Sequence, residues 1–185
     1  MLKQMMGITG LLFLFGLIFA SFPCHAGDDS QGGDHTSSVA LQAKSMVEAV
    51  YEFIIDNDYD MDKVQTALMT SPEFIDNEKR LYIFMHAYDR EKKEAVCIGQ
   101  GTRPELVGKN MWHLRTPNGR HLFAEFIGLI ETKGQGWIEY DWLEPYDRKI
   151  RIKVSFIKGI ELKNRKKAWI GCGYWKPRKK GFRVP

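Results

Sequence analysis

A run of alternating basic and apolar residues at 148–156 contains the side chains best suited to bind an anion. Successive side chains of a β-strand point to opposite faces, so a strand here would separate the two kinds. One face would carry Lys149, Arg151, Lys153 and Ser155, and the other Ile150, Ile152, Val154 and Phe156. A lysine turned toward a partly enclosed site is costly to desolvate unless an anion meets it. The pattern has two interpretations: an anion site at Lys153, or the solvated face of an edge strand.

Several aromatic and polar residues outside this run could also contact a ligand. Tyr140 and Trp142 share one face of a predicted strand, and tyrosine supplies both an apolar wall and a hydroxyl. Trp112, His113 and Arg115 follow a Val-Gly-Lys-Asn turn, and an arginine can hold a carboxylate through two parallel hydrogen bonds. Each of these residues could instead serve only packing or solubility.

The sequence contains no pattern typical of an enzyme or a metal centre. The aspartates at 56–62 resemble a calcium loop, but Met61 stands where such a loop needs glycine, and Ala67 where it needs glutamate. The histidines lack metal-ligand spacing, and no serine or cysteine lies in a nucleophile elbow. Packing on a strand explains Cys172, which lies between two glycines. We therefore expect no catalytic residue, no metal and no cofactor.

Apolar periodicity predicts helices in the first part of the chain. Apolar residues recur at three- and four-residue steps over 39–55, which predicts a helix capped by Ser37 or Ser38. Asp60 can cap a second helix, and the segment at 71–73 (Ser-Pro-Glu) is typical of a further cap. Another amphipathic helix is predicted over 119–132.

Residues rich in aromatic and β-branched side chains predict five strands. These lie at 81–88, 94–99, 137–142, 148–160 and 167–175. Short connections at both ends of the series predict an antiparallel sheet, with the helices segregated to one face, which is an α+β fold. Met85 and His86 would point to opposite faces of the first strand. Cys97 and Cys172 would lie on different strands, so we expect two buried free thiols.

The first 26 residues are typical of a secretory signal peptide. Lys3 precedes an apolar stretch at 8–22, and small residues surround a cleavage site after Ala26. An uncleaved anchor is the alternative, since residues 5–23 would just span a bilayer. Either outcome places the rest of the chain outside the cytosol, in the periplasm or secreted. Residues 27–38 are polar and glycine-rich, which predicts a flexible linker.

The net charge of +4 is unevenly distributed. Residues 158–185 contain ten lysines and arginines against one acidic residue, Glu161. The predicted domain, residues 39–175, is thus followed by a basic tail at 176–185. Export argues against nucleic acid as a partner, and the tail lacks the aromatic platform of single-strand binders. It would be either a solvated tail or a contact site.

Five motifs, taken in order, connect these predicted elements with a known family. They are YIF (82–84), PELVGKN (104–110), GQGWIEYDW (134–142), KVS (153–155) and WIGCGY (169–174). In this order and at these spacings the chain resembles the single-Cache family of extracellular sensor domains, which have a PAS-like fold. One departure is CIGQGTR at 97–103, where the family usually has an Ala-His-Pro-like stretch.

The resemblance implies a pocket between the sheet and the loops that cross it, with the lysine at 153 available to pair with a carboxylate. The implied ligand is a small carboxylate or an amino-acid-like metabolite. The residues expected to bind it are Lys153, Tyr140, Trp142, Trp112, His113, Arg115, Met85 and Ser155.

A free-standing sensor of this kind would not be an enzyme and would pass its signal to a partner, such as a membrane histidine kinase or a chemoreceptor. It would touch the membrane only through an uncleaved signal segment. The alternative is a periplasmic scaffold that keeps the fold without a ligand pocket. The altered segment at 97–103 and the basic tail favour this alternative.

Overall fold

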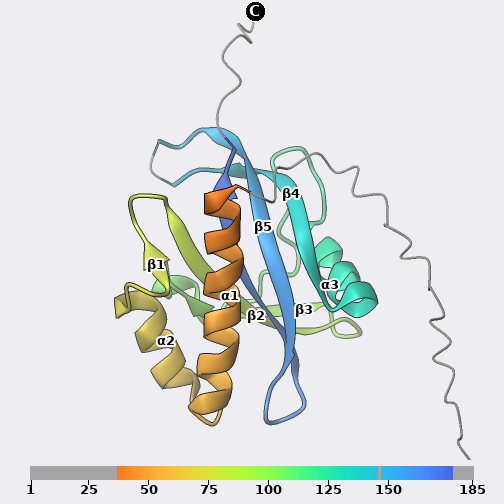
Figure 1. The fold of residues 1–185 in the computed structure, drawn as a ribbon. Helices are drawn as coiled ribbons and strands as arrows, with labels where there is room; N and C mark the ends of the chain where they lie inside the picture. The colour runs from red at the N-terminus through yellow and green to blue at the C-terminus, as the bar shows by residue number, and fades with distance from the viewer. Residues whose placement is uncertain (1–36, 146, 177–185) are drawn as a thin grey trace, which may run out of the picture. The chain divides into compact units, whose positions relative to one another are not determined.

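The computed structural model describes residues 37–145 and 147–176, whose arrangement is shown in Figure 1. The predicted signal peptide, the linker up to residue 36 and the tail from residue 177 lie outside these residues. The elements in chain order are α1 (Ser38–Asp56), α2 (Met61–Thr70), β1 (Ile75–Asp76), β2 (Leu81–Asp89), β3 (Glu94–Gln100), the short 3₁₀ helix η1 (Pro104–Leu106), α3 (Leu122–Lys133), β4 (Gln135–Leu143), β5 (Ile150–Glu161) and β6 (Lys167–Trp175). In this part of the chain, no helix has both the length and the apolar character needed to cross a bilayer.

Both of the first helices begin at predicted caps. The Ser37 Oγ accepts a hydrogen bond from the Ala40 amide at 3.4 Å, and the Asp60 Oδ1 accepts one from the Lys63 amide at 3.1 Å. Such bonds satisfy backbone donors that have no partner within the helix. Asp60 thus has a structural role at the start of α2, within the segment that resembled a calcium loop.

The segment at 71–73 does not begin a helix, and this prediction was wrong. Ser71 ends α2, and its hydroxyl accepts a hydrogen bond from the Glu73 amide at 3.3 Å. A tight turn follows, in which the buried Phe74 packs edge-on against Phe53 at 5.3 Å between ring centroids. The buried Phe74 side chain anchors the turn, and the chain then enters β1. Because β1 has only two residues, no apolar periodicity in the sequence could predict it.

The sheet is antiparallel throughout and contains six strands, one more than predicted. Its strand order is β1-β2-β6-β5-β4, and β3 also pairs with β2. The central pairing of β2 with β6 brings the first predicted strand beside the last, far apart in the sequence. The additional strand is β1, which pairs with the start of β2 through Ile75 and Tyr82. The α+β class and the PAS-like architecture are confirmed.

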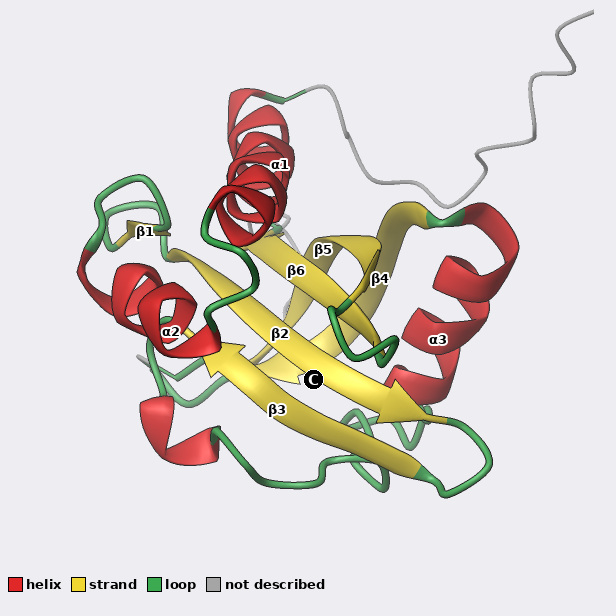
Figure 2. Cartoon of the chain, turned by 90° about the horizontal axis from the view of Figure 1, so that it is seen from below, coloured by secondary structure: helices red, strands yellow, loops and turns green. Residues whose placement is uncertain are grey.

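The helices lie on both faces of the sheet, whereas the sequence predicted one. In Figure 2, α1 and α2 cover one face, and α3 lies at the other side with the long connections. Strand β2 is buried on both faces, since Ile83 and Met85 belong to the core under α1 and α2, and Tyr82 and Phe84 to the core under α3. A strand that is buried on both faces does not alternate between apolar and polar residues. Its sequence therefore does not indicate on which face of the sheet a given helix packs.

The two cysteines are buried free thiols. Cys97 lies in β3 and Cys172 in β6, and both strands pair with β2 between them. Neighbouring strands are roughly 4.8 Å apart, so two strand spacings exceed the reach of a disulfide. Burial raises the pKa of the Cys172 thiol to about 12, which keeps it protonated.

Gly171→Ala should lower the free energy of unfolding. A Cβ at this position would lie 2.5 Å from the ring of Phe84 and 2.8 Å from the Ile157 Cδ1. Overpacking of this kind costs roughly 1–3 kcal/mol, which urea denaturation of the purified protein would measure.

Gly128→Ala in α3 is the matched control, because a Cβ there meets nothing within 4 Å. Alanine is favoured over glycine inside a helix by roughly 0.5–1 kcal/mol, so this variant should be slightly more stable. Equal effects of the two substitutions would contradict the packing between β2, β5 and β6.

Candidate functional site

A cavity of about 260 Å³ lies on the α3 side of the sheet. Strands β2, β4 and β5 form its floor, α3 forms one wall, and residues from the connections after β3 and β4 complete it. Apolar side chains form most of the lining, and its polar side chains are Tyr82, His86, Gln100, Arg103, Tyr140 and Lys153. An apolar pocket with a few convergent polar groups is the usual form of a small-molecule site.

The dominant feature of this cavity is a buried lysine. Lys153 is only 2% exposed, and its ammonium donates a hydrogen bond to the Tyr82 hydroxyl at 2.8 Å. The same nitrogen lies 4.2 Å from the centre of the Tyr82 ring and 5.2 Å from that of Phe84. Among the described residues, no carboxylate forms an ion pair with Lys153. Aromatic faces and one hydroxyl therefore supply most of its local stabilisation.

A glycine on the neighbouring strand leaves the space that the lysine side chain occupies. A Cβ at Gly173 would lie 3.0 Å from the Lys153 Cε and 2.1 Å from the Ser155 Oγ. The absence of a side chain on this part of β6 leaves room for the Lys153 stem to cross toward Tyr82. Burial lowers the pKa of Lys153, but the oxygens of Tyr82 and Tyr140 raise it, and the balance lies above its usual value. The side chain is therefore a charged ammonium at neutral pH.

A second hydroxyl pair lies beside the lysine. The Tyr140 hydroxyl and the Ser155 Oγ are 3.0 Å apart in a hydrogen bond, and both residues are buried. Burial is the largest cause that raises the pKa of Tyr140, which keeps the phenol neutral. Tyr140 lines the cavity, whereas Ser155 lies behind it and orients it.

An imidazole occupies another part of the floor. His86 lines the cavity, is 4% exposed, and lies between aromatic rings, stacked on Trp169 at 5.1 Å and tilted against Phe123 at 4.7 Å. Its Nδ1 is buried and has no hydrogen-bond partner. Burial lowers the pKa of His86 to about 3, because an imidazolium here would lose its hydration without gaining a counterion.

A cluster of charges holds the β4–β5 connection at the edge of the cavity. Glu144 is fully buried and forms ion pairs with Arg80 and Arg151, and Arg151 also pairs with Asp147. Breaking a buried pair leaves an uncompensated charge, so these contacts fix the connection firmly. Pro145, next to Glu144, consequently lines the cavity.

The structure brings together three of the eight predicted ligand residues. Lys153, Tyr140 and Trp142 line the cavity, and Ser155 supports Tyr140 from behind. The other four lie elsewhere.

Met85 belongs to the core under α1 and α2, on the opposite face of the sheet, because it alternates with Phe84 and His86 along β2. Trp112 is buried against His121 at 5.7 Å between ring centroids, outside the cavity lining. His113 and Arg115 are exposed, and the Arg115 guanidinium donates to the Gly119 carbonyl at 3.0 Å. These positions therefore do not provide the carboxylate clamp that the sequence suggested at 112–115.

Sequence reasoning missed four polar residues of the lining: Tyr82, which it placed only in a family motif, and His86, Gln100 and Arg103. His86 shares the Tyr82 face of β2 by simple alternation, a signal that was available. Gln100 and Arg103 come from the segment at 97–103 that departs from the family pattern. The Gln100 backbone is fixed by two hydrogen bonds to the Gln65 side chain, at 2.8 and 3.1 Å.

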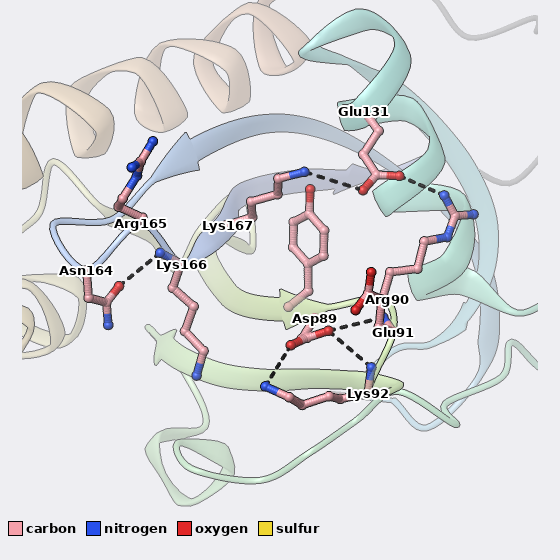
Figure 3. A pocket seen from close by; sticks show the side chains of 10 residues that line it. Asp89, Arg90, Glu91, Lys92, Glu131, Asn164, Arg165, Lys166 and Lys167 are labelled. Carbon is pink, nitrogen blue, oxygen red and sulfur yellow. Dashed lines mark hydrogen bonds and ion pairs between the residues drawn. The ribbon is translucent and has the colours of Figure 1, made fainter.

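A larger groove of about 850 Å³ lies at the far ends of the hairpins, between the β2–β3 and β5–β6 turns (Figure 3). It is an open surface feature, and two of its three acidic side chains are paired with basic neighbours. Glu131 pairs with Arg90 at 2.7 Å and with Lys167 at 3.9 Å, and Asp89 pairs with Lys92 at 3.0 Å. Such exposed pairs need no further ligand. We therefore assign the candidate site to the smaller, less open cavity at Lys153.

An antiparallel sheet in this strand order, with a long N-terminal helix on one face and a partly enclosed cavity on the other, is a PAS-like architecture. The chain belongs to the Cache domain family, whose model matches residues 29–170.

Several solved structures have the same fold. The periplasmic sensor domain of a chemotaxis protein is 22% identical, with a TM-score of 0.54, and the alignment covers 75% of this chain and 92% of that one. A Cache chemosensory domain described for carboxylic acid recognition is 17% identical, with a TM-score of 0.55 and coverage of 75% and 89%. A methyl-accepting chemotaxis protein from Vibrio parahaemolyticus is 19% identical, with a TM-score of 0.52 and coverage of 70% and 80%.

The stability of the protein should fall as the pH is lowered from 6.5 toward 3, and His86→Phe should flatten this dependence. The pKa of His86 is about 3 in the folded protein against its usual 6.5, so in this interval the unfolded chain binds a proton that the folded chain does not. The free energy of unfolding then falls by at most about 1.4 kcal/mol per pH unit. Above this interval the contribution is constant.

Urea denaturation at a series of pH values would measure this effect. His113→Phe removes a histidine from an exposed position and is the matched control. Identical pH profiles for the wild-type protein and His86→Phe would contradict the buried, neutral state of His86.

Proposed function

We propose that this protein is an exported sensor that binds a small organic carboxylate in the cavity at Lys153 and signals through a partner protein. The observation that carries the proposal is the buried ammonium of Lys153, which faces the cavity without a carboxylate partner among the described residues. A carboxylate is the simplest ligand that would complete this arrangement.

The physical argument rests on the cost of burying a charge. An ammonium removed from water loses its hydration, and one hydroxyl with three aromatic rings, those of Tyr82, Phe84 and Trp175, replaces only part of it. An anion in the cavity would form a charge-assisted hydrogen bond in a region of low dielectric, where such bonds are strongest. The Tyr140 hydroxyl and the Gln100 amide line the same cavity and could bind the second carboxylate oxygen.

The size and lining of the cavity favour a small metabolite. At about 260 Å³ it is near the lower end of typical ligand pockets. Phe84, Phe126 and Trp142 provide an apolar surface for the ligand body. The relative described for carboxylic acid recognition supports the same ligand class.

The route of signalling is inferred from the family. Relatives with this fold are sensor domains of chemotaxis proteins. We infer that the domain acts outside the cytoplasm, through the signal peptide predicted at 1–26, and that its partner is a membrane histidine kinase or a chemoreceptor. The proposed activity is binding without catalysis.

Lys153→Met should weaken the binding of short carboxylates by roughly ten- to a hundredfold, the usual worth of a hydrogen bond to a charged group. A panel of short carboxylates and amino acids, screened by thermal shift, would provide the ligand. An acid at about 100 times its dissociation constant adds roughly 2.7 kcal/mol to the stability of the wild-type protein.

In the absence of ligand, Lys153→Met should be as stable as the wild-type protein or more stable, because it removes a buried charge. Lys149→Met is the matched control, an exposed lysine near the start of β5, and should bind the acid normally. Undiminished binding by the Lys153 variant would refute the site. Failure of every acid to stabilise the wild-type protein would favour a scaffold instead.

A further inference from the structure

The floor of the cavity has polar groups at two separated places. Tyr82, Phe84 and His86 point into it from the same face of β2. Adjacent rings in this row are 6.4 Å apart at both steps. Because a strand rises about 3.3 Å per residue, His86 lies roughly 13 Å from Tyr82 along β2. The Lys153 ammonium lies over Tyr82, so the charge and the imidazole are at opposite ends of this row.

The middle of the row is apolar. Phe84 faces Phe126 of α3 in a stacked arrangement, with ring centroids 6.3 Å apart. Leu122 and Met111 also line the cavity. A ligand that extends along the row would therefore place a carboxylate at Lys153, an apolar body over Phe84, and its far end near His86.

The end at His86 contains polar atoms without partners. The buried Nδ1 of His86 forms no hydrogen bond, and neither does the Nε1 of Trp169, whose ring is stacked on the imidazole. Leaving a buried donor or acceptor unsatisfied is costly, so such groups normally have a partner in the functional state. Of these two residues only His86 lines the cavity, so its unpartnered imidazole is what indicates a polar group at this end.

The chemistry of the His86 imidazole limits which polar group of a ligand can bind at this end. A neutral imidazole has one donor and one acceptor, which a hydroxyl can match in either direction. A second carboxylate would need a positive charge, and burial lowers the pKa of His86 to about 3. His86 is surrounded by the uncharged Phe84, Phe123 and Trp169. The other cation of the lining besides Lys153 is Arg103, and its guanidinium is already paired with Glu105 at 2.9 Å.

We propose that the ligand is a monocarboxylate with a neutral hydroxyl at its far end, and that His86 is the residue that selects this hydroxyl. This inference rests on the proposed function, since it places the carboxylate at Lys153. It adds a second subsite and excludes dicarboxylates of the same length.

The test compares three acids that differ only at the far end: phenylpropanoate, its para-hydroxyl derivative and its para-carboxyl derivative. Isothermal titration calorimetry would measure their binding to the wild-type protein. We expect the hydroxyl derivative to bind about tenfold more tightly than the parent acid, and the dicarboxylate more weakly than both.

Two variants separate hydrogen bonding from packing. His86→Phe keeps an aromatic ring between Trp169 and Phe123 but cannot hydrogen-bond, so the hydroxyl preference should disappear while the parent acid still binds. His86→Gln restores a donor and an acceptor, so part of the preference should return. Lys153→Met should weaken all three acids by a similar factor and leave the ratio between them unchanged.

The outcomes distinguish this proposal from the proposed function. If the wild-type protein binds the parent and hydroxyl acids equally, or if the preference persists in His86→Phe, the selecting role of His86 is wrong and the carboxylate site stands. If none of the three acids binds to the wild-type protein, a ligand extended along this row is wrong, whereas the site at Lys153 is refuted only if the short carboxylates of the panel also fail to bind.

Discussion

The buried ammonium of Lys153 is the constraint on which the rest of the site depends. It requires Gly173 on β6, because any side chain there would collide with the lysine stem and with Ser155. It requires Tyr82, whose hydroxyl and ring face are its nearest partners. Ser155, in turn, holds Tyr140 at the same end of the cavity. The hydroxyl and the aromatic rings stabilise the buried ammonium enough for the protein to fold. The ammonium still lacks a negatively charged partner among the described residues, so binding of an anion beside it is favourable.

The sheet makes this arrangement possible because both of its faces are buried. The core under α1 and α2 contains large aliphatic side chains, and Ile54, Leu68 and Ile83 in it are completely buried. The α3 side contains more aromatic rings, several of which line the cavity. The cavity is thus confined to the α3 side of the sheet. The Glu144 ion pairs support the edge of that cavity from outside.

Much of the fold could be predicted from the sequence, because its main signals are local. The caps at Ser37 and Asp60, the helix spacing of α1 and α3, and the alternation in β5 each depend on near neighbours. The place of α3 could not be predicted, because β2 is apolar on both faces and gives no direction. Within the site, Lys153 and Tyr140 followed from alternation and resemblance. Gln100 and Arg103 depend on how a long connection folds, which no periodicity describes.

A crystal structure of the protein with its tightest-binding monocarboxylate would test the central claim most directly. The account predicts one carboxylate oxygen within hydrogen-bond distance of the Lys153 ammonium, beside the hydroxyls of Tyr82 and Tyr140, with the body of the acid over Phe84. An acid bound outside the cavity, or inside it with its carboxylate turned away from Lys153, would contradict the account.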